Sequence, residues 1–154
     1  MKIWIDHVSS KIIPAWHKLL QWTSSSPYSL NDARIEFRNQ LKAWIREIAP
    51  REDGPWWSGA QFSMADIVLA PWALRHWVFA HFGKDPQIPE EGHGGGDEEV
   101  WERWRAWVKA VEGRESVVKL MSERKHYVPI YERYAKDEAQ SEMAKAVREG
   151  RGPP

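Results

Sequence analysis

Phe62-Ser63-Met64-Ala65-Asp66-Ile67 decides the fold of this chain, because it combines two devices that start a helix. Ser63 and Asp66 form an acidic variant of the capping box, in which the hydroxyl accepts from the Asp66 amide and the carboxylate accepts from the Ser63 amide. Phe62 and Ile67 occupy the two positions of a hydrophobic staple across that cap. An apolar run follows at once, and a buried helix must have its first N–H groups satisfied. The stretch therefore predicts the start of a buried central helix.

The composition argues against several classes of protein. A chain of 154 residues suits one domain that buries about 70% of its unfolded surface. The 22 basic and 22 acidic residues balance, which argues against nucleic acid or an anionic membrane as the main partner. There is no cysteine, so this polypeptide supplies neither a disulfide nor a thiolate nucleophile. With no signal peptide and no apolar run near the ~18 residues of a membrane span, we expect a soluble, cytoplasmic protein.

Hydrophobic periodicity predicts helices along the whole chain and strands nowhere. Pro14 and Pro71 lie inside two of the expected helices and should kink them. We therefore expect an all-α bundle of five or more helices around the central helix that Ser63 opens, formed by residues 1–137, with a polar C-terminal tail over 138–154. The predicted helices cover residues 3–20, 30–48, 64–82, 100–111, 116–121 and 122–135, with a further one possible within 137–149.

Two features concern the chain as a whole. Eleven tryptophans predict an aromatic core, an aromatic ligand cleft, or both, because each indole buries a large ring and needs a partner for its N–H. The first predicted helix begins almost at Met1 without an N-cap residue, although most helices at the start of a domain have one. We interpret the missing cap as a hint that something normally precedes Met1.

Taken in order, several motifs resemble the C-terminal helical domain of glutathione transferases, and most of all the Omega class and its fungal relatives. The resemblance extends from about Ile3 to Tyr134. The motifs that carry it are Trp57-Ser58-Gly59, the capping stretch from Phe62 to Ile67, Pro71-Trp72-Ala73-Leu74-Arg75, Glu115-Ser116-Val117-Val118, and the segment from Ser122-Glu123-Arg124 through Tyr127 to Tyr134.

In that family a preceding thioredoxin-like domain holds the glutathione site and the catalytic Ser, Tyr or Cys, and this sequence shows no βαβ pattern that would match it. The resemblance therefore implies no catalytic residue here and glutathione as a co-substrate that this chain alone does not bind. The family's helical domain supplies the wall of the co-substrate pocket. By motif, the implied substrate-binding residues are Arg75, Trp72, Tyr127 and Tyr134, with Trp4, His7 and Lys11 added from the first helix; a one-residue insertion before Tyr127 leaves His126 as its alternative.

Plainer interpretations stand beside these. We interpret Ser63 and Asp66 as a cap and not as a catalytic pair, because no histidine lies at a useful spacing to act as base. Arg75 can form a salt bridge at the rim or contact a polar group of the ligand in the cleft. The histidines lack the spacing with which a helix grips a metal ion, so we expect no metal site.

The resemblance implies a part in a glutathione-dependent reaction: conjugation, thiol transfer, or cis–trans isomerisation of an apolar or polyene metabolite, as in secondary metabolism. The expected partners are a small apolar or aromatic molecule, a thioredoxin-like domain or partner chain, and a second copy of this chain in a dimer or larger homo-oligomer. The alternative is a non-catalytic binding or interaction module, or a truncated product without turnover.

The cap is directly testable. Ser63→Ala or Asp66→Ala should cost about 1 kcal/mol or more of stability, because each removes a partner of the first N–H groups of the helix, with little direct effect on any chemistry. Thermal unfolding of both variants measures this cost. Unchanged melting together with lost turnover would contradict the structural interpretation.

Overall fold

All regular secondary structure in the computed structural model, which describes residues 1–154, is helical. The only β-type pairing is an isolated bridge between Trp56 and Gly59. The all-α class expected from the sequence is therefore confirmed. None of the helices combines the length and the apolar character that a bilayer crossing requires.

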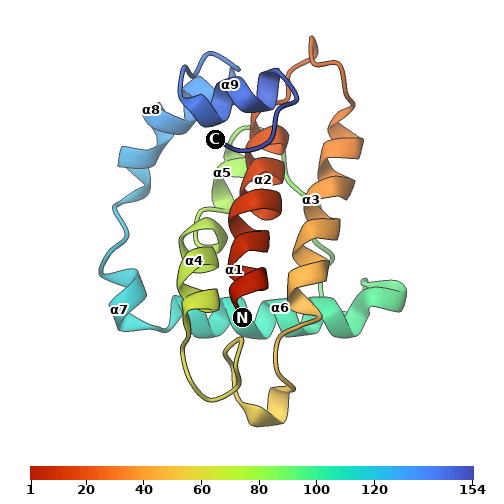
Figure 1. Ribbon diagram of the computed structural model, residues 1–154, viewed down its shortest axis with the longest axis vertical. Helices are drawn as coiled ribbons and strands as arrows, with labels where there is room; N and C mark the ends of the chain where they lie inside the picture. Colours follow the sequence, from red (N-terminus) through yellow and green to blue (C-terminus); the bar gives the residue numbers. More distant parts are fainter.

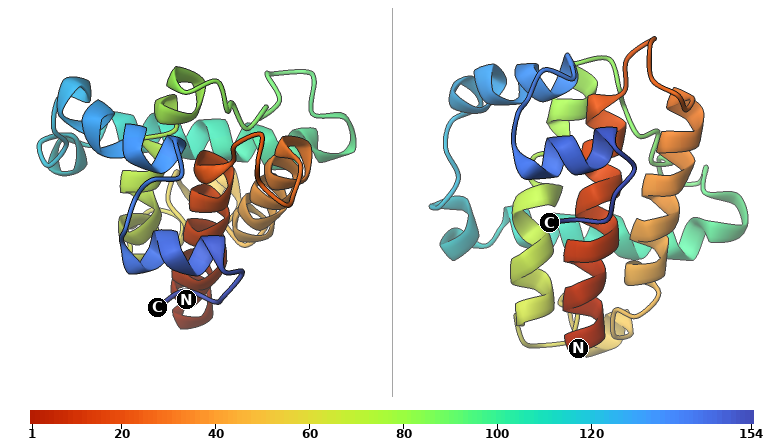
Figure 2. Two further views of the ribbon diagram at one scale, coloured as in Figure 1. Left: turned by 90° about the horizontal axis from the view of Figure 1, so that it is seen from above. Right: turned by 45° about the horizontal axis from the view of Figure 1, so that its top comes forward.

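The helices form a bundle in which one long rod lies between two flanking arms (Figure 1). The rod consists of α1, the π-helical turn η1 and α2; α3 runs antiparallel to it on one side, and α4 lies on the other. Helix α6 runs crosswise behind the rod, α3 and α4 in Figure 1, and α8 and α9 lie at the top, with α9 folded back over α2 (Figure 2). The bounds are α1 Lys2–His7, η1 Val8–Ile12, α2 Ile13–Gln21, α3 Leu30–Ile45, α4 Met64–Ala73, α5 Trp77–His81, α6 Glu98–Glu112, α7 Glu115–Val118, α8 Arg124–Ala135 and α9 Glu142–Arg148, with short 3-10 turns at Arg51–Asp53 and Gly95–Asp97.

Pro14 follows a π-helical turn that the sequence did not predict. A proline within a helix lacks the N–H and its ring crowds the carbonyl one turn earlier, here that of Ser10. The π-helical turn Val8–Ile12 widens the helix just before the proline. It includes a bond from the Ile13 amide to the Val8 carbonyl. The rod therefore continues through Pro14 as α2.

The central helix is shorter than the sequence predicts. It ends at Ala73, and the chain then turns through Leu74, Arg75 and His76 before α5 begins at Trp77. The turn uses tighter i→i−3 bonds, such as that from the Arg75 amide to the Trp72 carbonyl (3.2 Å). Arg75 is thus carried on a bend between two helices.

Large aromatic side chains fill the core, as the tryptophan count predicts. Trp16, Trp44 and Trp107 are fully buried. Trp44 meets Trp107 edge-on with ring centroids 5.1 Å apart, and Trp104 stacks on Trp107 at 5.3 Å. Ring contacts therefore join α3 to α6 within a core that also contains aliphatic side chains.

Asp66 connects three parts of the chain at the start of α4. Both arms of the capping box with Ser63 are present, and the Ser63 hydroxyl also donates to Asp66 Oδ2 at 2.7 Å. The other oxygen, Oδ1, accepts from the Trp57 amide and from Trp107 Nε1, both at 2.8 Å. Asp66 is completely buried, so every acceptor position of the carboxylate is served by the protein.

The two staple residues point in different directions. Phe62 packs on Trp56, with ring centroids 4.8 Å apart, and lies 4.0 Å beneath the guanidinium of Arg114. Ile67 is 48% exposed. Phe62 therefore anchors the loop before α4, while Ile67 contributes apolar surface to the outside of the bundle.

The tail contains an ordered helix. Ser141 caps α9 by accepting from the Ala144 amide (3.1 Å), and Ala144 and Ala146 are buried against the bundle. The Gln21 amide group of α2 donates to the Ala144 carbonyl at 3.1 Å. Whether residues 138–154 behave as a separate segment stays a prediction.

The two members of the cap should differ in cost. Asp66→Ala leaves the Trp107 indole N–H and the amides of Trp57 and Ser63 without an acceptor, so we expect a loss of about 3 kcal/mol or more, against about 1 kcal/mol for Ser63→Ala. Urea unfolding followed by tryptophan fluorescence measures both. Equal costs for the two substitutions would show that the loop and α6 do not depend on the carboxylate.

Candidate functional site

The candidate site is built around Arg75, a cation held by aromatic rings. Its guanidinium carbon lies 4.9 Å from the ring centroid of Tyr127 and 5.9 Å from that of Trp72. Nη1 donates to the hydroxyl of Tyr131 at 3.1 Å, and Nε is buried with no acceptor. No acidic side chain forms an ion pair with Arg75. The rim salt bridge considered from the sequence is therefore not formed.

Tyr127 is the most polarised of the rings. Its hydroxyl accepts from the Ser122 amide at 3.0 Å and stands close to the Arg75 charge. Burial acts to raise the pKa of Tyr127, but the Ser122 hydrogen bond and the positive charge of Arg75 outweigh it, so the pKa lies below its ordinary value. The Tyr127 hydroxyl thus accepts from the Ser122 amide and donates to Met121 Sδ at 4.0 Å.

Tyr131 and His17 form the floor behind these rings. Tyr131 stacks on Tyr127 at 6.2 Å and is almost fully buried, and burial raises its pKa. His17 lies 5.5 Å from Trp72, with Nδ1 buried and unpartnered, and burial lowers its pKa to about 4. The floor is thus aromatic and uncharged at neutral pH.

Lys84 fixes the helix that carries the tyrosines. It is almost fully buried, and its Nζ donates to the Leu20 carbonyl (2.5 Å) and to the Ala135 carbonyl (2.6 Å). These carbonyls close the C-terminal ends of α2 and α8, where a cation is favourable. Burial lowers the pKa of Lys84 to about 8. One lysine therefore joins the C-terminal ends of both helices, while Tyr127 lies near the other end of α8.

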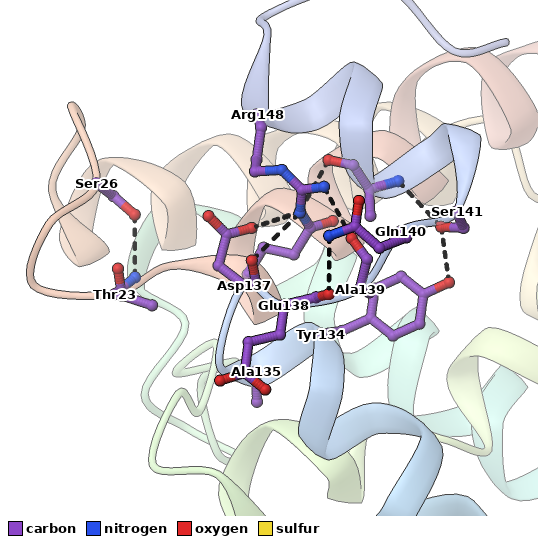
Figure 3. A network of polar contacts seen from close by, with 12 residues as sticks. Thr23, Ser26, Tyr134, Ala135, Asp137, Glu138, Ala139, Gln140, Ser141 and Arg148 are labelled. Atoms are coloured by element: carbon purple, nitrogen blue, oxygen red, sulfur yellow. Dashed lines mark hydrogen bonds and ion pairs between the residues drawn. The ribbon is translucent and has the colours of Figure 1, made fainter.

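Tyr134 belongs mainly to a polar network that fastens α9 (Figure 3). Its hydroxyl donates to Ser141 Oγ at 2.9 Å, and its ring lies 5.1 Å from that of His17. In the same network Arg148 donates to Asp137 Oδ1 (3.2 Å) and to the Ala139 carbonyl (2.8 Å). Tyr134 thus reaches the edge of the site through its ring, while its hydroxyl serves the fold.

The first-helix candidates lie apart from Arg75. Trp4 and His7 contact each other at 5.1 Å, and His7 Nε2 lies 3.1 Å from the Gln40 carbonyl of α3. Lys11 is exposed and forms neither a hydrogen bond nor an ion pair. His126, the alternative to Tyr127, is also exposed. The structure therefore brings together Arg75, Trp72 and Tyr127, places Tyr134 at their edge, and leaves the other candidates outside this cluster.

Two further features of the surface bear on ligands. A hollow of 630 Å³ lies between α2, the loop after it and the C-terminal tail, and most of the residues that line it are polar. It is separate from Arg75, whose cluster is an open aromatic surface. No three of the His, Asp and Glu side chains are arranged to hold a metal ion.

The family model described as "Glutathione S-transferase, C-terminal domain" matches residues 27–110. The chain therefore belongs to the glutathione S-transferase C-terminal domain family. Among solved structures it is similar to the crystal structure of glutathione transferase Omega 3C from Trametes versicolor, with 35% sequence identity and a TM-score of 0.65 over 91% of this chain. The matched region is 53% of that chain, so this polypeptide spans about half the length of its relative. No curated protein matches the sequence.

Sequence reasoning did not find two residues that shape the site. Tyr131 lies one helical turn after Tyr127, and that i, i+4 spacing is a signal that could have found it. Lys84 follows Gly83 in a segment that reads as a loop, and nothing in the sequence shows that it bridges two helix ends. Its partners are Leu20 and Ala135, both distant along the chain.

Acid should destabilise the protein through its buried histidines. Burial lowers the pKa of His17 to about 4, and that of His76 likewise. The unfolded histidine, with a pKa near 6.5, takes up its proton first, so stability is complete above about pH 6.5 and is lost as the pH falls toward 4. At pH 5 we expect a loss of roughly 2 kcal/mol for His17. His17→Phe should flatten the dependence of Tm on pH, whereas His126→Gln, at an exposed position, should leave it unchanged; equal slopes in all three proteins would contradict the assignment.

Proposed function

We propose that this chain forms the co-substrate wall of a glutathione-dependent transferase or isomerase, completed by a thioredoxin-like domain or partner chain. The observation that carries the proposal is the cluster of Arg75, Trp72 and Tyr127, which presents an aromatic surface with one uncompensated cation. Membership of the glutathione S-transferase C-terminal family supports it. Glutathione would be the co-substrate, held by the completing domain.

The chemistry of the wall suits an apolar or conjugated molecule. Aromatic faces bind flat, apolar ligands, while a few fixed polar groups orient them. Here Arg75 and the Tyr127 hydroxyl are those polar groups, and they are held in place by Tyr131 and Ser122. Conjugation, thiol transfer and cis–trans isomerisation all need this orienting role, because the reacting thiol would come from glutathione.

A surface for the completing domain is available beside α1 and α4. Ile3 is 78% exposed, Met64 54% and Ile67 48%, and they lie on two neighbouring helices. Exposed apolar side chains grouped in this way favour association. We propose that a thioredoxin-like domain covers them, and that the chain alone self-associates through the same surface as a dimer or larger homo-oligomer.

A second candidate is a binding module without turnover. It is supported by the cluster itself, in which Arg75, Trp72 and Tyr127 offer ring and cation contacts to a flat ligand and include no thiolate nucleophile. Such a module would bind the same flat ligands on the same wall. The two candidates differ only in whether glutathione chemistry follows.

A chimaera tests the proposal. The thioredoxin-like half of the Trametes versicolor relative, joined before Met1, should give glutathione-dependent consumption of an aromatic electrophile, whereas this chain alone should bind glutathione no better than about millimolar. Trp72→Ala removes apolar contact of about 1.5–3 kcal/mol and should raise KM about tenfold or more. Ile35→Ala, an exposed apolar position on α3, is the matched control.

The possible results separate the candidates. Turnover that responds to Trp72→Ala and not to Ile35→Ala supports the enzyme. A folded chimaera that binds the electrophile without consuming it supports the binding module. Tight capture of glutathione by this chain alone would overturn both, because the thiol would then have a site on the helical domain itself.

A further inference from the structure

Arg75 carries a positive charge that no acidic side chain of the protein neutralises. Its guanidinium is packed against the faces of Tyr127 and Trp72, and its hydrogen-bond partners are tyrosine hydroxyls, that of Tyr131 at 3.1 Å from Nη1 and that of Tyr127, with no carboxylate among them. Arginine carries five N–H donors in the plane of the guanidinium. Rings that cover the face of that plane leave the in-plane donors free, and Nε is already buried with no acceptor.

A second cation lies on the same aromatic surface. Arg124, at the start of α8, has its guanidinium carbon 5.0 Å from the Trp77 ring centroid, and Trp77 meets Tyr127 edge-on at 6.5 Å. Arg124 forms no ion pair either. The two arginines therefore border one aromatic surface, which is defined by Trp72, Trp77 and Tyr127, with Tyr131 buried beneath it, and is called the arginine–aromatic surface below.

The acidic residues nearby are paired elsewhere. On α7 and α8 the glutamates form ion pairs with lysines of their own segments, so none of them neutralises the arginine–aromatic surface. These pairs are Glu115–Lys119, Glu123–Lys125 and Glu132–Lys136. Because neither arginine is paired with an acidic side chain, the arginine–aromatic surface is locally positive, and a positive surface attracts an anion.

The geometry points to a planar aromatic or conjugated carboxylate as the ligand of this surface, with the carboxylate on Arg75 and the conjugated body on Tyr127 and Trp72. A carboxylate matches the planar fork of a guanidinium and can accept two parallel N–H bonds from it. The inference rests on the proposed function, because it names the substrate class of the same wall. It goes beyond that function by requiring an acid group on the co-substrate.

The test compares an acid with its neutral counterpart on the complete chain. Naphthalene carboxylate and naphthalene carboxamide have the same flat body and differ in charge, and isothermal titration calorimetry measures the binding of each. We expect the carboxylate to bind at least about tenfold more tightly, since bonds from arginine to an ionised acceptor are about twice as strong as neutral ones. The preference should shrink as salt is added.

Variants assign the preference to one side chain. Arg75→Gln should abolish the preference for the acid, Arg75→Lys should retain part of it, and Arg51→Gln should leave it intact, because Arg51 is an exposed arginine paired with Glu102 at the other end of the bundle. Circular dichroism verifies that each variant is folded. If Arg75→Gln fails to fold, the wild-type comparison and the Arg75→Lys variant still decide the question.

Three outcomes would overturn the inference: equal binding of acid and amide, a preference that survives in Arg75→Gln, or no binding of either compound better than about millimolar. Failure of the proposed function gives a different result. A chimaera that turns over acidic and neutral electrophiles equally well sinks this inference and leaves the function standing. A preference for the acid without any glutathione-dependent turnover supports this inference and contradicts the proposed function.

Discussion

The carboxylate of Asp66 is the interaction on which the rest of the structure depends. One buried side chain accepts from the Ser63 amide and hydroxyl at the start of α4, from the Trp57 amide in the preceding loop, and from the Trp107 indole of α6. A buried carboxylate is tolerated only when its lone pairs are satisfied, so these donors must occupy fixed positions. The constraint sets where α4 begins and how α6 crosses the bundle. Trp107 in turn packs on Trp44, which extends the same constraint to α3.

The candidate site lies just beyond the C-terminal end of α4, whereas Asp66 lies in the first turn of the same helix. Because α4 ends at Ala73, Arg75 lies on a bend, and α8 is the helix that meets it. That meeting depends on Lys84, which binds the last carbonyls of α2 and α8, and on the polar network that fastens α9 through Tyr134 and Arg148. The position of the aromatic rings thus depends on hydrogen bonds between helix ends that are far apart in the sequence.

Much of the fold was predictable because it follows from short-range patterns. The S-x-x-D box, the helical spacing of apolar residues and the absence of alternation gave an all-α bundle and the start of α4 correctly. Helix ends were less predictable. The π-helical turn before Pro14 was not predicted, and the central helix stops well before the predicted Phe82. Both differences arise from hydrogen-bond adjustments that depend on neighbouring helices, which a sequence pattern does not contain.

The amino-acid sequence by itself determined the family and the helical class, and its motifs proposed Arg75, Trp72 and Tyr127 as site candidates, because motif and periodicity are local properties of the chain. Only the tertiary structure decided that Arg75 has no acidic partner, that Tyr131 completes the cluster, that Tyr134 is engaged with Ser141, and that Trp4, His7 and Lys11 lie elsewhere. The physical reason is that ion pairing and ring contact depend on distances between residues far apart in the chain. Those distances are set by how Asp66 and Lys84 hold the helices together.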